Sequence, residues 1–342
     1  MIKLNKFYKR HYIKKSKGIA LITVMLIVSL CAIIAAQMTT RLHMQMQRST
    51  NINFNQQAYW YAMGAEAFAK RVLLTTVKKD PDTINLGQIW AQGETSYPVD
   101  FGTITGEISD LQSCLNLNAL RSNDTIPSTS GGRATKSPAR EVFENLVIAL
   151  NIEGVSQFEA ESLADALKDW LDEDSRISSA GGAEDDDYAS RNFPYLAANH
   201  FLASLNELRV IEHFNPLIID GIKPYVCILP QLDTHKININ TVNPEQPELI
   251  EALLGVNRAD AQSILSARPT DGFETVADFL ALPEVTAVGL KDWQKDQFVV
   301  DSDYFMLKTT ASFNQSFYKL NVVINIIDNK ETQVVSRSVG YY

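Results

Sequence analysis

One uninterrupted apolar stretch constrains this chain more than any other feature. It begins at Ile19 and continues to Ala36, and no charged side chain occurs between Gly18 and Thr40. A helix of this length measures about 35 Å, which exceeds the roughly 30 Å hydrocarbon core of a bilayer. The sequence therefore predicts one membrane-spanning helix over residues 19–40.

The leader before this stretch is strongly basic and sets the expected orientation. It carries seven cationic side chains, namely Lys3, Lys6, Lys9, Arg10, Lys14, Lys15 and Lys17. Positively charged flanks stay in the cytoplasm, so we expect residues 1–18 there and the bulk of the chain exported. A plain single-span anchor and a secretory signal cleaved near Ala32, Ala35 or Ala36 are the alternatives that hydropathy leaves open.

The junction between leader and apolar stretch favours a third interpretation. Lys17-Gly18 is followed at once by Ile-Ala-Leu-Ile-Thr-Val-Met-Leu, which resembles the class III signal of type IV pilins and type II secretion pseudopilins. In that family a prepilin peptidase cleaves after the glycine on the cytoplasmic side, and the apolar helix is kept. The resemblance implies cleavage between Gly18 and Ile19.

The fifth residue after this site departs from most of the family. Most members have a glutamate there, thought to pair with the N-terminal amine of a neighbouring subunit, and here the residue is Thr23. An unpaired carboxylate at mid-helix costs about 2.5–3.5 kcal/mol in the membrane, and a subunit that enters a filament first meets no such amine. The absence of a glutamate at this position therefore resembles pseudopilin K of type II secretion, the family proposed to occupy the pseudopilus tip. This resemblance covers essentially the whole chain.

Composition fits a folded, exported part. The chain has 342 residues, 45% of them hydrophobic, and a net charge of −9 that includes the basic leader, so bulk nucleic-acid binding is disfavoured. Cys31 falls in the apolar helix, where it is expected to pack as a small residue. Cys114 and Cys227 fall in the exported part, where disulfides persist. We expect these two to pair, with two buried free thiols as the alternative.

The pattern of elements changes twice along the chain. Apolar residues at helical spacing from Ala58 to Val72 predict a helix that ends near Lys79, before Pro81. The remaining expected elements are short strands within 97–105, 105–110 and 114–117, helices over 141–150, 157–171, 197–208 and 244–254, and an antiparallel meander of strands over 304–313, 317–327 and 332–341.

These elements indicate an α+β protein. By resemblance, a long pilin-like N-terminal helix packs on an antiparallel sheet, and a large all-α insertion of SAM-like or helix-hairpin-helix-like type interrupts the sheet. The expected parts are a cleaved leader (1–18), the transmembrane helix (19–40), the pseudopilin helix with the first strands (41–118), the inserted helical domain (119–297) and the C-terminal strands that complete the sheet (298–342).

Carboxylates concentrate in two segments of the expected insertion, Asp169–Asp174 and Glu184–Asp187. Crowded carboxylates repel one another, and Ca²⁺ takes six to eight oxygen ligands. The residues alone leave open a solvated acidic loop or a calcium site, and Ile177 stands where an EF-hand needs glycine. Pseudopilin K proteins carry a similar block with bound calcium. That resemblance implies Ca²⁺ held by Asp172, Asp174, Glu184 and Asp187, with Asp185 and Asp186 as further candidates.

Residues 236–283 resemble a helix-hairpin-helix unit, which also occurs in DNA-uptake proteins. There, two hairpin glycines let backbone amides approach a phosphate. Here Asn257 replaces the second glycine, and Arg258 and Arg268 are surrounded by acidic residues. This favours a packing module, with a membrane-anchored periplasmic DNA-binding uptake protein as the alternative function.

The sequence gives catalysis little support, because its histidines are scattered and no nucleophile, phosphate or dinucleotide motif occurs. We expect a non-enzymatic minor pseudopilin in the inner membrane of a Gram-negative bacterium, with a cytoplasmic N-terminus and a periplasmic C-terminal domain. It would initiate and cap the pseudopilus tip and so support export of folded proteins.

The resemblance also implies the partners. They are minor pseudopilins I and J, pseudopilin H through them, prepilin peptidase and the inner-membrane assembly platform, with secreted substrate or the outer-membrane secretin at the tip. No nucleic-acid partner is expected. A generic calcium-stabilised, membrane-tethered receptor is a further alternative.

Overall fold

The computed structural model describes residues 18–123, 126 and 136–340. The chain divides into two compact units, residues 1–56 and residues 57–342, which are described separately. Apart from Gly18, the predicted leader lies outside the described residues, as does Tyr341, the last residue of the expected meander.

The described part of the first unit belongs to helix α1, which runs from Ile19 to Lys79. Among the described residues, α1 is the one helix long and apolar enough to cross a membrane, and its apolar window is not buried against protein. Thr23 donates its hydroxyl hydrogen to the carbonyl oxygen of Ala20 at 2.9 Å. The helix backbone therefore satisfies the hydroxyl of Thr23. A carboxylate at the same position has no hydrogen to donate and would stay unpaired within the helix.

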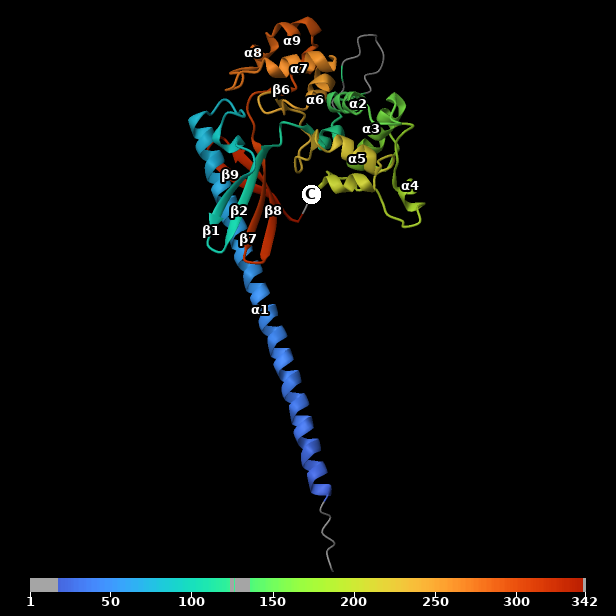
Figure 1. Cartoon of the computed structure of the whole chain (residues 1–342). Helices are drawn as coiled ribbons and strands as arrows, with labels where there is room; N and C mark the ends of the chain where they lie inside the picture. The colour runs from blue at the N-terminus through green and yellow to red at the C-terminus, as the bar shows by residue number, and fades with distance from the viewer. Residues whose placement is uncertain (1–17, 124–125, 127–135, 341–342) are drawn as a thin grey trace, which may run out of the picture. The chain divides into compact units, whose positions relative to one another are not determined.

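A five-stranded antiparallel sheet dominates one part of the second unit, with strand order β1-β2-β7-β8-β9 (Figure 1). Its strands are β1 (Thr95–Val99), β2 (Gly102–Asp110), β7 (Tyr304–Phe313), β8 (Ser316–Ile327) and β9 (Glu331–Val339). The last strand of the sheet before the helical region is β2, and β7 pairs with it on return. The prediction of one sheet interrupted by a large helical segment is thus confirmed.

The C-terminal part of α1 packs on this sheet. Its buried face repeats every three or four residues and consists mainly of small or aliphatic side chains, namely Ala58, Ala62, Glu66, Ala69, Leu73, Thr76 and Val77. Alternate residues of β7 and β8, such as Phe305, Leu307 and Val322, complete the core on the sheet side. The helix ends at Lys79, as the sequence predicted.

Glu66 is the exception on this apolar face. Its side chain is 3% exposed, and Arg337 of β9 donates two hydrogen bonds to it at 2.7 and 2.8 Å. A buried carboxylate requires such a partner, so this pair fastens the last strand to α1.

The helical region lies between β2 and β7 and contains helices α2 to α10. Their bounds are Pro138–Ala149, Gln157–Leu171, Asp185–Ala189, Pro216–Ile222, Pro247–Leu254, Arg258–Ser266, Val276–Leu280, Pro283–Val288 and Asp292–Lys295. Short 3₁₀ helices occur in this region at Leu117–Arg121 and Leu205–Arg209, and another, Ile89–Ala91, precedes β1. A separate apolar core fills this region, with Phe143, Leu163, Leu167 and Tyr188 among its fully buried side chains.

Three sequence expectations need correction. The insertion expected over 119–297 is not all-α, because it contains β4 (Val226–Cys227) and β5 (Ile237–Asn238). These pair in parallel with two strands just outside it, β3 (Leu115–Asn116) and β6 (Phe298–Val299). The expected helix over 197–208 shrinks to the 3₁₀ turn at Leu205–Arg209. The expected strand over 97–105 is a hairpin, in which Phe101 adopts a left-handed backbone conformation (φ 58°) between β1 and β2.

Two features tie the sheet to the helical region. A disulfide joins Cys114 and Cys227 beside the β3–β4 pair, with a Cα–Cα distance of 5.7 Å. At the end of β2, Asp110 is buried and accepts hydrogen bonds from the hydroxyls of Thr241 and Ser302, at 2.5 and 2.6 Å. Burial raises the pKa of the Asp110 carboxyl to about 6.

Candidate metal centre

The acidic segments predicted from the sequence lie at the C-terminal end of α3 and the start of α4. Asp172 is the residue that caps the end of α3, and Glu184 is the residue immediately before α4. The intervening loop contains Asp174 and runs back along α3, from the C-terminal end of that helix toward its N-terminal end. The side chain of Asp174 accepts the backbone N–H of Arg176 at 2.9 Å, which bends the loop locally.

This path brings three of the six predicted ligands together. Carboxylate oxygens of Asp172, Asp174 and Glu184 all lie within 4.8 Å of one another. Asp174 is exposed, Asp172 is half-buried and Glu184 is buried. Hard carboxylate oxygens that converge at this spacing, with one side open to solvent, match the donor set and the hydration that Ca²⁺ accepts.

Glu184 provides the test of whether a cation fits. Its side chain is 3% exposed, and within the described residues neither carboxylate oxygen makes a well-formed hydrogen bond. Burial, together with the charges of Asp169 and Asp172, raises the pKa of Glu184 to about 7. Buried carboxylates are normally paired, so a divalent cation would supply the missing partner, and the residues present fit one.

The other three predicted ligands have different positions. Asp187 accepts the backbone N–H of Glu184 at 3.0 Å and so caps α4. Asp185 accepts the backbone N–H of Ala197 at 3.0 Å and thereby holds the following loop. Asp186 is exposed. None of the three belongs to the group whose oxygens converge, within the part of the chain that the structure describes.

Asp169 is the residue that the sequence reasoning did not single out. It is fully buried one turn before Asp172, and its carboxylate accepts hydrogen bonds from the backbone N–H and hydroxyl of Ser178. Burial raises its pKa to about 6. A Cβ on Gly182 would lie 1.9 Å from the Oδ2 atom of Asp169. The Gly-Gly pair at 181–182 was the available signal, because only glycine lets the loop lie this close to α3.

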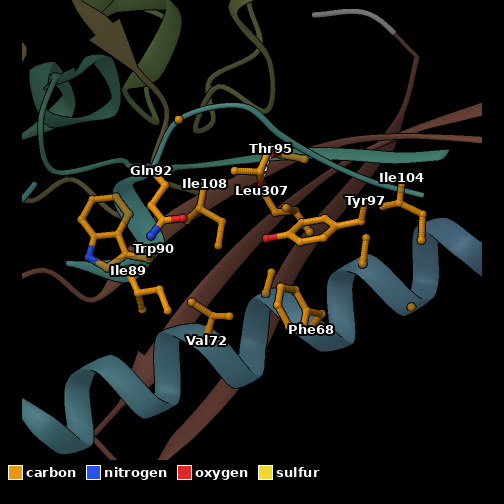
Figure 2. Close-up of a pocket in the computed structure, with 15 residues that line it drawn as sticks. Phe68, Val72, Ile89, Trp90, Gln92, Thr95, Tyr97, Ile104, Ile108 and Leu307 are labelled. Atoms are coloured by element: carbon orange, nitrogen blue, oxygen red, sulfur yellow. Dashed lines mark hydrogen bonds between the residues drawn. The ribbon is translucent and has the colours of Figure 1, made fainter. Parts of the chain in front are cut away.

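Besides the acidic cluster in the helical region, the structure has a groove in the sheet-containing part, between α1 and the β1–β2 hairpin (Figure 2). Its volume is about 340 Å³, and apolar side chains line it, among them Phe68, Val72, Trp90 and Tyr97. Asp, Glu, His, Lys and Arg are absent from its described lining. The groove is therefore an apolar surface with a few neutral polar groups, such as the Tyr97 hydroxyl, along it.

The helix-hairpin-helix-like segment has its arginines engaged internally. Helices α6 and α7 are joined through Gly255, which has φ of 71°, and the Asn257 side chain caps α7. Arg258 forms an ion pair with Glu248 at 2.7 Å. Arg268 donates to the carbonyl oxygens of Ile239 and Val242 at 3.1 and 2.7 Å. The DNA-binding alternative therefore gains no support from this hairpin.

Comparisons with known proteins agree with the resemblance drawn from the N-terminal sequence. Two family models described as "Type II secretion system (T2SS), protein K" match residues 113–231 and 237–301. Type II secretion system protein K of Aeromonas hydrophila is 38% identical over 93% of this chain and 95% of its own length. The protein K of Pectobacterium carotovorum is 32% identical over 96% of this chain and 98% of its own.

A solved structure shows the same fold. The match is a chain of the GspK-GspI-GspJ complex from the type 2 secretion system of enterotoxigenic Escherichia coli, with a TM-score of 0.75 and 32% sequence identity. It covers 86% of this chain and all of that one. A long N-terminal helix, an antiparallel sheet and a helical insertion thus define a pseudopilin of the type II secretion system. Within that class, the chain belongs to the protein K family.

Proposed function

We propose that the chain is cleaved between Gly18 and Ile19 by a prepilin peptidase and remains in the inner membrane through the first part of α1. The uncharged residues 19–40 and the basic leader support this topology. The leader would stay in the cytoplasm until cleavage, and the unit from residue 57 onward would fold in the periplasm, where the Cys114–Cys227 disulfide can form.

The proposed role is non-enzymatic initiation and capping of the pseudopilus tip. Thr23 supports the first position in assembly, because its hydroxyl is satisfied within the helix and requires no amine from a subunit above it. The helical insertion adds more than 150 residues between β2 and β7. Such bulk is compatible with one terminal position and unfavourable for a subunit repeated along a fibre.

The proposed partners are minor pseudopilins I and J. The single observation that carries this proposal is the match over the whole of a chain in the GspK-GspI-GspJ complex. Pseudopilin H would be reached through them, and the assembly platform, secreted substrate and outer-membrane secretin are further contacts. The hairpin of α6 and α7 serves as a packing module, since its apolar residues, Leu249, Leu253 and Ile264 among them, belong to the core of the insertion.

Calcium is the proposed structural ion of the insertion. Asp172, Asp174 and Glu184 would hold it, and water would complete the coordination shell on the exposed side. The ion would fix the end of α3 against the start of α4 by neutralising carboxylates that otherwise repel one another.

Co-purification tests the proposed assembly. Full-length protein with a C-terminal affinity tag, expressed together with minor pseudopilins I and J, should retain both after detergent extraction. Retention on duplex DNA that is lost with added salt, without retention of the two pseudopilins, would instead favour the DNA-uptake alternative.

A further inference from the structure

We propose that Arg140 and Asp165 are positioning residues, which hold the loop at Gly181 in place and so set the calcium affinity of the Asp172–Glu184 centre. This inference rests on the proposed calcium site. Neither residue is a ligand of the proposed centre, because Asp165 of α3 lies outside the group whose carboxylate oxygens converge and the Arg140 guanidinium of α2 is a cation without an acceptor atom.

The centre needs such positioning because its ligands come from separate segments. Asp172 and Asp174 follow α3 directly, whereas Glu184 lies ten residues beyond Asp174. Fixing the backbone of each loop residue costs about 1–2 kcal/mol of conformational entropy. If the loop is already ordered before the ion arrives, that cost does not reduce the calcium affinity.

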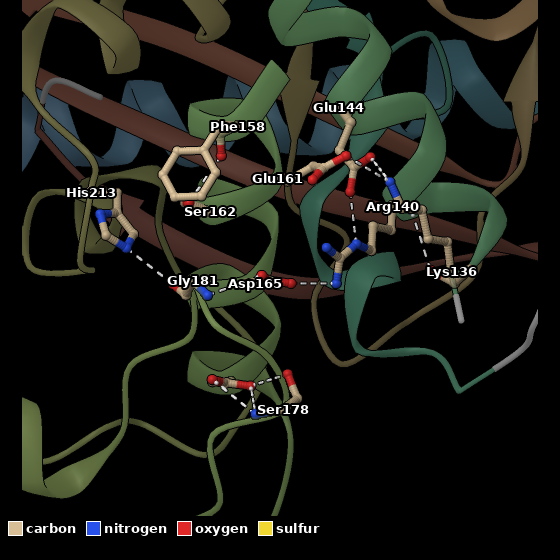
Figure 3. A network of polar contacts seen from close by, with 12 residues as sticks. Lys136, Arg140, Glu144, Phe158, Glu161, Ser162, Asp165, Ser178, Gly181 and His213 are labelled. Carbon is tan, nitrogen blue, oxygen red and sulfur yellow. Dashed lines mark hydrogen bonds and ion pairs between the residues drawn. The ribbon is translucent and has the colours of Figure 1, made fainter. Parts of the chain in front are cut away.

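Two sets of contacts attach the loop to α3. Near its middle, Ser178 donates to the carboxylate of Asp169. Three residues later, the backbone N–H of Gly181 donates to Asp165 Oδ2 at 3.3 Å, and the carbonyl oxygen of Gly181 accepts from His213 Nε2 at 3.0 Å (Figure 3). A Cβ at Gly181 would lie 2.6 Å from the Cα of Ser162, so the loop backbone lies directly on the helix at this point.

Arg140 fixes the carboxylate that holds Gly181. Its Nη1 atom lies 2.5 Å from Asp165 Oδ1, and its Nε atom donates to Glu144 Oε1 at 2.8 Å. Lys136 pairs with the other oxygen of Glu144 at 2.6 Å. The side chains of Arg140 and Asp165 are 12% and 8% exposed, so solvent screens this ion pair little. Figure 3 shows the chain of contacts from Lys136 through Glu144, Arg140 and Asp165 to Gly181.

Loss of the guanidinium would leave a buried carboxylate without a countercharge. Such a group turns toward water, and this movement weakens its hold on the N–H of Gly181. Glu184, three residues further along, would then lie near Asp172 and Asp174 for only a fraction of the time. The apparent calcium affinity is multiplied by that fraction.

The experiment measures Ca²⁺ binding by calorimetry to the full-length protein in detergent, after removal of metal with EGTA. Arg140→Gln should raise the Kd about tenfold, if the competent loop population falls to roughly one tenth, and leave the stoichiometry unchanged. Addition of Asp165→Asn to this variant should recover part of the loss, because the uncompensated charge is removed while an acceptor for Gly181 remains.

Arg337→Gln is the matched control. It breaks an arginine pair with an equally buried carboxylate, Glu66, in the sheet-containing part of the unit. It should lower the melting temperature and leave the calcium Kd unchanged. Equal increases in Kd for Arg140→Gln and Arg337→Gln would mean that only global stability is involved, and would overturn the inference.

Two outcomes separate this inference from the proposed function. Calcium binding by the wild-type protein that Arg140→Gln leaves unaltered overturns the positioning role alone. No calcium binding by the wild-type protein overturns the proposed centre and the positioning claim with it. Faster amide hydrogen exchange at residues 181–184 in metal-free Arg140→Gln, but not in Arg337→Gln, would be the independent sign that the loop has been released.

Discussion

Glu184→Gln should stabilise the metal-free protein and remove its response to calcium. Both carboxylate oxygens of Glu184 are buried. One carboxylate oxygen each of Asp172, Asp174 and Glu184 lie within 4.8 Å of one another. Glutamine keeps the shape of the side chain, removes its charge and offers an amide N–H₂ group to the neighbouring carboxylates. The substitution therefore relieves repulsion in the empty centre and eliminates one ligand for the ion.

The size of the effect follows from the pKa of Glu184. The folded protein raises this pKa from 4.5 to about 7, so the folded state binds the proton more tightly than the unfolded state. Stability is therefore lost as the pH rises from 4.5 through 7, and above that range the loss approaches about 3 kcal/mol. We expect Glu184→Gln to recover about 1–3 kcal/mol at about pH 8, and each kcal/mol corresponds to roughly 2–4 °C in melting temperature for a domain of this size.

The assay is thermal unfolding of the full-length protein in detergent, with EGTA or with calcium. At 100 times its Kd, calcium should stabilise the wild-type protein by about 2.7 kcal/mol. The gain should shrink toward about pH 5, because protonated carboxyls do not bind the ion. Asp186→Asn removes an exposed carboxylate outside the group and should behave as wild type. A Glu184→Gln protein that unfolds earlier than wild type in EGTA, or keeps the full calcium effect, would refute the reasoning.

Three further perturbations test other parts of the structure. Replacement of both Cys114 and Cys227 by alanine should cost about 3–5 kcal/mol of unfolding free energy, because the disulfide closes a loop of 113 residues, and an unchanged urea midpoint would argue against this. Arg337→Ala should lower stability by about 1–3 kcal/mol, because the buried Glu66 carboxylate loses both arginine hydrogen bonds and is left with Lys70, 3.7 Å away, as its countercharge; thermal unfolding identical to that of wild type would contradict this. Thr23→Glu should leave the melting temperature unchanged and let the subunit enter the pseudopilus away from the tip, so that crosslinks to the repeating pseudopilin appear; their absence would count against the role of Thr23.

Long, regular elements of this fold could be predicted from the sequence. Helix α3 has the predicted bounds, 157–171, because its apolar residues keep one helical face over fifteen residues. Strand β7 likewise matches 304–313, because every second side chain along most of its length is buried. The gap between the predicted strands 317–327 and 332–341 is a turn, in which both Asp328 and Asn329 adopt left-handed conformations.

Segments without a local pattern could not be predicted. Residues 197–204 contain helix-forming residues, yet the chain there is held by distant contacts, among them the bond from the Ala197 N–H to Asp185. Strand β3 falls within the predicted strand over 114–117, whereas the two-residue strands β4, β5 and β6 are fixed by parallel pairing between segments far apart in the sequence. The burial of Glu66 on an apolar helix face could not be predicted locally, because its partner, Arg337, comes from the last strand.

The candidate centre was predictable in composition and only partly in geometry. Sequence and family resemblance identified all six acidic candidates, and the structure groups Asp172, Asp174 and Glu184. The distinction between ligands and caps depends on how the loop lies against α3. That path is determined by Asp165, Asp169 and Gly181, whose contacts span nine to sixteen residues of sequence.

The mature N-terminus is the most direct test of the proposed pseudopilin processing. Mass spectrometry of the protein from cells with and without prepilin peptidase would identify its first residue. A chain that begins at Ile19, and does so only when the peptidase is present, is the expected result. A chain that retains Met1 or begins near Gln37 in cells that contain the peptidase would contradict the proposed processing and the assembly that follows from it.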